Sequence, residues 1–128
     1  MKAVQNVLIV DDSPTEVESM SGILRKHGYK VMVATNGEDG VVKAQRHAPD
    51  LVLMDVVMPG LNGFHATRQL SRDPLTKDIP VVLVSTKDQE TDRVWGMRQG
   101  ATDYLIKPVQ EKALLNAIAR IVDPRAAL

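Results

Sequence analysis

The sequence contains no cysteine, and this absence excludes disulfide bonds, thiolate metal sites and cysteine nucleophiles. It also has no formal net charge, because 16 basic side chains balance 16 acidic ones, so a basic surface for nucleic acid is not expected. No apolar run is long enough to span a membrane, and the amino terminus lacks the pattern of a signal peptide. A cytoplasmic location without membrane insertion fits these absences.

Length and composition indicate one globular domain. The chain has 128 residues, of which 44% are hydrophobic and 25% are charged, a balance typical of soluble proteins. This length is close to the commonest domain size and is sufficient for a sizeable core. No repeat or low-complexity tract divides the chain, so we expect a single domain over residues 1–128.

Short apolar runs alternate with segments of helical character along the whole chain. Turn residues bound each run, which is typical of strands buried on both faces of a sheet, and the runs cover residues 7–10, 30–34, 51–54, 80–84 and 104–106. The second run is more polar and is expected at a sheet edge. Five strands alternating with five helices predict a doubly wound α/β fold with a parallel sheet covered on both faces. Because crossovers are right-handed, the first and third strands should be neighbours where the winding reverses.

The first and last helices have the strongest signals. Ser13 is a suitable N-cap, Pro14 occupies the first helical position, and Glu16 lies three residues after the cap. The spacing of later apolar residues continues this helix as far as Gly28, which favours a stop. The last helix is the most clearly amphipathic, because four apolar residues recur at i, i+3, i+4 and i+7: Leu114, Ala117, Ile118 and Ile121.

The other three helices are less clearly marked. Val41 and Ala44 outline a short second helix that ends before Pro49, and a weakly periodic third helix closes at Asp73.

The fourth helix is predicted from one apolar stripe. Val94, Met97 and Ala101 are expected to be buried on this stripe, and Gly100 to end the helix. Trp95, the only tryptophan, is expected to pack beside the stripe rather than to anchor a partner.

Polar residues follow the strands directly at four places. Asp11 and Asp12 follow the first strand, Asp55 the third, Ser85 the fourth and Lys107 the fifth. The carboxyl ends of parallel strands meet at one edge, where open α/β sheets bind ligands. Three carboxylates at one edge repel each other unless a cation neutralises them, and Mg²⁺ prefers oxygen ligands and water. The sequence therefore predicts a Mg²⁺ site here, although one acid could instead serve the dipole of the following helix.

Four motifs surround these polar residues: Val10-Asp11-Asp12-Ser13, Leu53-Met54-Asp55 with Met58-Pro59-Gly60, Val84-Ser85-Thr86, and residues 100–108 with the sequence Gly-Ala-Thr-Asp-Tyr-Leu-Ile-Lys-Pro. Together, in this order and spacing, they resemble the receiver domains of two-component response regulators, the CheY-like family. Residues 58–64 and 85–92 are similar to the single-domain receivers of twitching-motility (type IV pilus) chemosensory systems, the PilH type. The resemblance implies a flavodoxin-like fold with the strand order 2-1-3-4-5.

The resemblance also implies a role for each residue at the edge. Asp55 would be the nucleophile that takes a phosphoryl group from a histidine kinase or a phosphotransfer domain, forming an aspartyl phosphate. Asp12 and Asp55 would bind Mg²⁺ through their side chains, Asp11 through a water molecule and Val57 through its backbone carbonyl. Lys107 would neutralise charge on the phosphoryl oxygens.

Signal output is implied to involve two further residues. Ser85 would donate its hydroxyl to the phosphoryl group, and Tyr104 would be a switch side chain that alternates between an outward and an inward rotamer. The alternative for Tyr104 is simple packing at a strand end with its hydroxyl in water. The Lys107–Pro108 bond would be cis. The readout would be protein contacts with a downstream effector, made by the fourth helix, fifth strand and fifth helix of a monomer.

Some positions depart from the family pattern. Ser85 stands where threonine is common, Thr86 where a smaller residue is frequent, and Val57 and Lys87 where many relatives have polar or acidic side chains. These departures concern the lifetime of the phosphoryl group. The sequence also leaves open the cognate kinase, the effector, and whether the receiver transmits the signal or drains phosphoryl groups from a sister receiver.

Two other classes of protein share this topology. An aspartate-nucleophile phosphatase would need a second aspartate two residues after Asp55, where Val57 stands. A flavin-binding module would need a phosphate-binding loop after the first strand, where Asp11 and Asp12 would repel the phosphate. The sequence therefore favours a signalling receiver whose chemistry is confined to its own phosphorylation and dephosphorylation, and not an enzyme.

Overall fold

A computed structural model of the chain describes residues 3–123. In this part of the chain, one parallel sheet contains β1 (Asn6–Val10), β2 (Lys30–Ala34), β3 (Leu51–Asp55), β4 (Val81–Ser85) and β5 (Asp103–Ile106). The helices that alternate with them are α1 (Pro14–Lys26), α2 (Gly37–His47), α3 (Gly63–Arg72), α4 (Glu90–Arg98) and α5 (Glu111–Val122). The strand order is β2-β1-β3-β4-β5, which confirms the predicted doubly wound, flavodoxin-like fold. Every predicted strand boundary agrees with the structure to within one residue.

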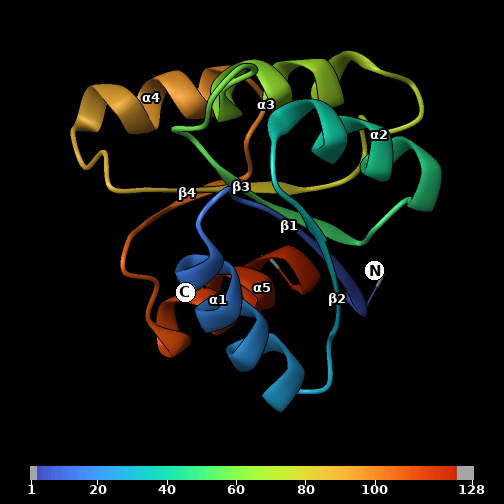
Figure 1. Ribbon diagram of the computed structural model, residues 1–128, viewed down its shortest axis with the longest axis vertical. Coiled ribbons are helices and arrows are strands. Elements are labelled where there is room, and N and C mark those ends of the chain that lie inside the picture. Colours follow the sequence, from blue (N-terminus) through green and yellow to red (C-terminus); the bar gives the residue numbers. More distant parts are fainter. Residues whose placement is uncertain (1–2, 124–128) are drawn as a thin grey trace.

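The helices cover both faces of the sheet. Helices α2, α3 and α4 lie on one face, and α1 and α5 lie on the other (Figure 1). Successive strand residues point to opposite faces, so Leu8 joins the core under α2 and α3 while Ile9 joins the core under α1 and α5. Strands β1, β3 and β4 are almost fully buried, and each large apolar side chain there contributes ~1.5–3 kcal/mol to folding. The apolar runs seen in the sequence are therefore the centre of the fold.

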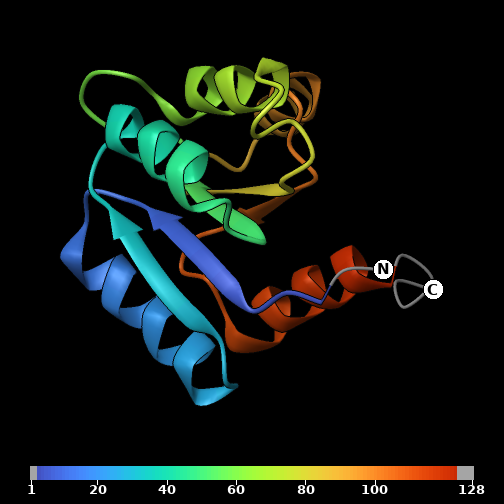
Figure 2. The ribbon, with the colours of Figure 1, turned by 90° about the vertical axis from the view of Figure 1, so that its right-hand side faces the viewer.

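Strand β2 lies at an edge of the sheet, as its polarity predicted. It pairs with β1 on one side, and Figure 2 shows it beside β1 with α1 running along it. The ammonium of Lys43 on α2 donates a hydrogen bond to the carbonyl of Val33 at 2.6 Å. A lysine that occupies a free carbonyl of an edge strand opposes pairing with another chain.

Asparagine and serine side chains start three of the helices. Ser13 accepts from the N–H of Glu16, which confirms the predicted start of α1. The Asn36 side chain accepts from Asp39 N–H, so α2 begins at Gly37, earlier than its first apolar residue indicated. Asn62 caps α3 in the same way. In this chain, the capping residues indicate where helices begin as clearly as the apolar periodicity does.

The predicted buried stripe of α4 is wrong. Val94 is 41% exposed and Met97 38% exposed, and Trp95, expected to pack, is 46% exposed. The helix instead turns Gly96 toward the sheet, where a Cβ atom would lie 2.5 Å from Leu83 Cδ1. A glycine adds nothing to an apolar periodicity, so the pattern selected the wrong face of this helix.

The end of α4 also differs from the prediction in one respect. The helix ends at Arg98, followed by Gln99 as C-cap and by Gly100 with φ of +111°. Gly100 therefore has the expected stop role. Ala101 is buried as predicted, but it lies beyond the helix, in the segment that leads into β5. Among residues 3–123, no helix combines the length and the apolar character that crossing a membrane requires.

Candidate functional site

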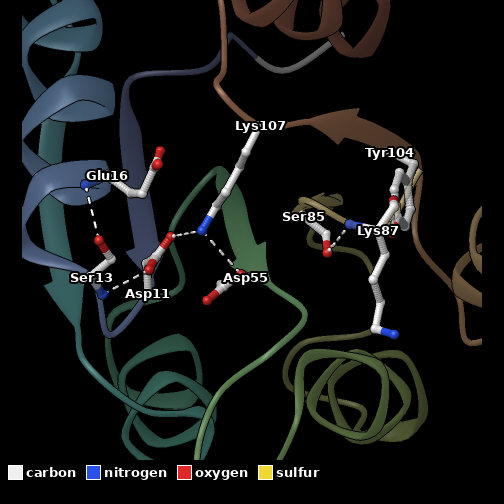
Figure 3. A network of polar contacts seen from close by, with 8 residues as sticks. All are labelled: Asp11, Ser13, Glu16, Asp55, Ser85, Lys87, Tyr104 and Lys107. Carbon is white, nitrogen blue, oxygen red and sulfur yellow. Dashed lines mark hydrogen bonds and ion pairs between the residues drawn. The ribbon is translucent and has the colours of Figure 1, made fainter.

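Polar side chains converge at the carboxyl edge of the sheet. Asp11 and Asp12 follow β1, Asp55 ends β3, Ser85 ends β4 and Lys107 follows β5. Each aspartate contributes one carboxylate oxygen to a group whose members lie within 4.8 Å of one another. Figure 3 shows Lys107 reaching down between Asp11 and Asp55, with Ser85 on the far side of Asp55. The structure thus brings together all five side chains that the strand ends predicted.

The turn between β1 and α1 holds Asp11 in the site. Its side chain is buried, and Oδ1 accepts a hydrogen bond from Ser13 N–H at 2.9 Å. Ser13 is also the N-cap of α1, so the start of the helix and the placement of the carboxylate depend on the same residue. Asp12, the next residue, is exposed and borders a cavity of about 530 Å³ between α1 and β2. One acid is therefore fixed inside the protein while the other faces solvent.

Lys107 bridges the two buried carboxylates. Its Nζ lies 2.9 Å from Asp11 Oδ2 and 3.2 Å from Asp55 Oδ1, and all three side chains are less than a tenth exposed. Burial alone would lower the pKa of Lys107, but the hydrogen bond with Asp11 and the attraction of Asp55 outweigh it and raise that pKa. The ammonium is thus held in its charged form at the centre of the site.

Asp55 is the acid of the cluster whose pKa is raised. Burial and then repulsion by the Asp11 charge raise the pKa of Asp55 from 3.8 to about 6, although the attraction of Lys107 acts in the opposite direction. This is the pattern expected when two carboxylates share one site. The single ammonium is not sufficient to neutralise the cluster.

The donor set suits a divalent cation. Three carboxylates and one ammonium carry a formal charge of −2 (−3 + 1), and the grouped donor atoms are carboxylate oxygens. Mg²⁺ takes oxygen ligands, usually one or two carboxylates together with waters. Val57, two residues after Asp55, follows the same strand and is 58% exposed. Its carbonyl as a metal ligand stays a prediction.

The loop between β3 and α3, residues 56–62, closes tightly on Asp55. Gly63 N–H donates to the carbonyl of Val56 at 2.9 Å, and a Cβ atom at Gly63 would collide with the carbonyl oxygen of Asp55. Only glycine allows this approach, so Gly63 fixes the direction in which the loop leaves the strand. Sequence reasoning missed Gly63, whose available signal was its place directly after the N-cap Asn62.

A second hydrogen-bonded chain runs from the site to β5. Ser85 Oγ accepts from Lys87 N–H at 3.0 Å, and the hydroxyl of Tyr104 donates to the carbonyl of Lys87 at 2.8 Å. Tyr104 is only 5% exposed, and Figure 3 shows its ring beside Lys87. The ring of Tyr104 is thus packed, as the alternative expected, but its hydroxyl is hydrogen-bonded within the protein and does not lie in water. The switch role of Tyr104 stays a prediction. The Lys107–Pro108 bond is cis, which confirms that prediction.

The sheet order and the acid edge define a class of signalling domain. Residues 7–119 match the family model described as the response regulator receiver domain, and the chain belongs to that family. Among its relatives, the chain is 60% identical to protein PilH of Pseudomonas aeruginosa over 116 residues, which are 91% of this chain and 96% of PilH. Both the predicted family and the predicted PilH-type resemblance are confirmed.

Solved structures show the same fold. The chemotaxis protein CheY4 of Vibrio cholerae superposes with a TM-score of 0.86 at 31% identity, covering 93% of this chain and 99% of that one. The receiver domain of a sensor histidine kinase from Pseudomonas aeruginosa PAO1 has a TM-score of 0.85 at 30% identity, covering 94% of this chain and 98% of that one. That structure contains a magnesium ion coordinated in the active-site cleft.

Proposed function

We propose that this receiver accepts a phosphoryl group on Asp55 in the presence of Mg²⁺, in a chemosensory phosphorelay of type IV pilus twitching motility. The observation that carries the proposal is the bridge of Lys107 between Asp11 and Asp55, inside a cluster of three carboxylates. The similarity to PilH supports the pilus system, and the magnesium ion of the Pseudomonas receiver supports the metal.

The residues of the site divide the chemistry among themselves. An oxygen of the Asp55 carboxylate attacks phosphorus, the bond from phosphorus to the donor breaks, and the donor leaves with that electron pair. Lys107, 3.2 Å from Asp55 Oδ1, is placed to meet an oxygen of the arriving phosphoryl group. A raised pKa of about 6 leaves Asp55 ionised at neutral pH, so the nucleophile is available. Asp12, Asp55, the Val57 carbonyl and, through a water, Asp11 would hold Mg²⁺, which supplies positive charge for the phosphoryl oxygens.

Signal output is proposed to begin at Ser85. Turning its hydroxyl toward a phosphoryl group on Asp55 would weaken the bond from Lys87 N–H, and the carbonyl of Lys87 is the partner of the Tyr104 hydroxyl. A movement of the Ser85 side chain would therefore affect Tyr104 through Lys87, which is hydrogen-bonded to both residues. Phosphorylation acts on such an arrangement by shifting the populations of two states.

The proposed readout surface is formed by α4, β5 and α5. These elements are tied together at Asp103, whose carboxylate lies 2.7 Å from Arg120 of α5 and 3.8 Å from Arg93 of α4. Because Asp103 directly precedes Tyr104 on β5, a change at Tyr104 acts next to this junction. A downstream effector protein is the proposed partner of the surface, and a histidine kinase or phosphotransfer domain is the proposed donor.

Phosphorylation by a small donor tests the chemistry. Incubated with acetyl phosphate and Mg²⁺, the protein should gain one phosphoryl group that is labile to base. Asp55→Asn should gain none, and Asp78→Asn, which removes an exposed aspartate away from the site, should behave as the unmodified protein. Full labelling of Asp55→Asn would contradict the assignment.

Amide exchange with and without beryllofluoride, a mimic of the phosphoryl group, tests the output. Altered protection should extend from the acid edge into residues 86–106. Changes confined to the acid edge would contradict the proposed route through Lys87 and Tyr104.

A further inference from the structure

A carboxylate outside the acid cluster contacts the loop that follows Asp55. Glu38 lies in the first turn of α2, and its Oε1 accepts a hydrogen bond from Leu61 N–H at 2.7 Å. Leu61 belongs to the loop of residues 56–62 and packs against the core on its apolar side. The loop is thus held near its carboxyl end by a helix that contributes no residue to the acid cluster.

Two glycines make this contact possible. Gly60 has φ of +76°, and a Cβ atom there would lie 2.9 Å from Glu38 Oε1. A Cβ atom at Gly37 would collide with the carbonyl oxygen of Leu61. The backbones of the loop and of the start of α2 are therefore in direct contact, and the Glu38 carboxylate adds a hydrogen bond between the two segments.

Glu38 is free for this contact because the helix does not need it as a cap. The Asn36 side chain already accepts from Asp39 N–H at 2.7 Å. A carboxylate in the first turn of a helix is also favoured by the positive end of the helix dipole. The helix start thus stabilises the charge that holds the loop.

We propose that Glu38 is a positioning residue for the metal site, because it holds residues 56–62 in the conformation that presents the Val57 carbonyl. The inference rests on the proposed function, in which that carbonyl is a ligand. A carbonyl ligand depends on the conformation of its loop and not on the side chain that it belongs to. The Gly63 N–H on Val56 joins the two ends of the loop, and the Asn62 cap fixes its carboxyl end. Glu38 holds Leu61, the residue before this cap, and so limits the paths that the chain can take from Val57 to Leu61.

The expected effect follows from the population of the binding-competent loop. If removing the Glu38 carboxylate lets the loop adopt other conformations, the apparent Kd for Mg²⁺ rises in inverse proportion to the fraction that remains competent. Because this hydrogen bond is exposed to solvent, it is worth about as much as an ordinary one, which is enough to change such a fraction about three- to tenfold. The effect should appear in metal affinity and should disappear when Mg²⁺ is saturating.

Calorimetric titration with MgCl₂ tests the proposal on three variants. Glu38→Ala should raise the Kd for Mg²⁺ about three- to tenfold. Glu38→Gln keeps an acceptor oxygen and should stay within about twofold of the unmodified protein. Asp39→Ala is the matched control, because it removes an acid from the same helical turn whose carboxylate pairs with Lys43 instead of the loop. It should also stay within about twofold.

Two further measurements separate positioning from general stability. Amide exchange at Leu61 should be faster in Glu38→Ala than in Asp39→Ala. Labelling of Glu38→Ala by acetyl phosphate should be slow at low Mg²⁺ and should return to the unmodified rate at saturating Mg²⁺.

The outcomes distinguish this inference from the function on which it rests. If the unmodified protein binds Mg²⁺ and Glu38→Ala binds it equally well, the inference is overturned and the proposed function stands. An equal loss in Asp39→Ala would assign the effect to charge and overturn the inference as well. Absence of Mg²⁺ binding by the unmodified protein would overturn the proposed function and the inference together.

Discussion

Replacing Asp55 with asparagine removes a charge that the folded protein disfavours. Burial and the neighbouring Asp11 raise the pKa of Asp55 from 3.8 to about 6, and its side chain is only 7% exposed. The folded protein therefore holds the Asp55 proton more tightly than the unfolded chain does. Ionised Asp55 consequently lowers stability, and this loss develops as the pH rises from about 4 to about 6.

The magnitude follows from the size of the shift. A shift of roughly two units corresponds to about 3 kcal/mol at neutral pH, since one unit is worth about 1.36 kcal/mol. Near pH 4 the same group costs less than about 1 kcal/mol, because it is then largely protonated in the folded state. Asparagine has nearly the shape of the protonated acid and carries no charge. Asp55→Asn should therefore stabilise the metal-free protein by about 3 kcal/mol at pH 7 and by little at pH 4.

Urea unfolding followed by far-UV circular dichroism, in the presence of EDTA, measures this difference at each pH. The difference between the variant and the unmodified protein isolates Asp55 from every other titrating group. Asp78→Asn, an exposed control, should change the free energy of unfolding by less than about 0.5 kcal/mol at either pH. A difference for Asp55→Asn that is independent of pH, or a loss of stability at pH 7, would refute the electrostatic reasoning.

Three further substitutions test packing and charge in the metal-free protein by the same unfolding assay. Lys107→Met should destabilise it by about 3 kcal/mol, because Asp11, whose side chain is fully buried, loses its ammonium partner; a neutral result would contradict the bridge. Thr67→Val should stabilise it by about 1 kcal/mol, because the buried Thr67 hydroxyl has no hydrogen-bond partner among the described residues; a loss would indicate a partner. Gly96→Ala should destabilise it by about 1–3 kcal/mol despite the better helix propensity of alanine, since its Cβ would crowd Leu83; a gain would show that the sheet yields there.

The sequence is informative where buried strands are involved. A strand that is covered on both faces must be apolar throughout, so its ends are visible as the first polar residues after the run. This rule is sufficient to predict that Asp11, Asp55, Ser85 and Lys107 lie at one edge of the sheet, where the fold places them. The pairing of Lys107 with both Asp11 and Asp55 requires only that the carboxyl ends of these parallel strands meet.

The sequence is less informative where glycine or a long-range contact decides the structure. Gly96 turns α4 toward the sheet without contributing to any apolar pattern, which is why the spacing of Val94 and Met97 predicts the wrong buried face. The bond from Leu61 N–H to Glu38 joins residues that are 23 apart in the chain, and no local pattern predicts it. Such contacts depend on how α2 and the loop pack, which only the folded arrangement reveals.

Locating the phosphoryl group tests the central claim most directly. After incubation with acetyl phosphate and Mg²⁺, borohydride reduces an aspartyl phosphate to homoserine, and the modified residue can be identified by peptide mass spectrometry. We predict homoserine at position 55, with a yield that depends on Mg²⁺. A stable phosphate on Ser85 or Thr86, or homoserine at position 11 or 12 with residue 55 unmodified, would contradict the assignment of Asp55 as the phosphoacceptor.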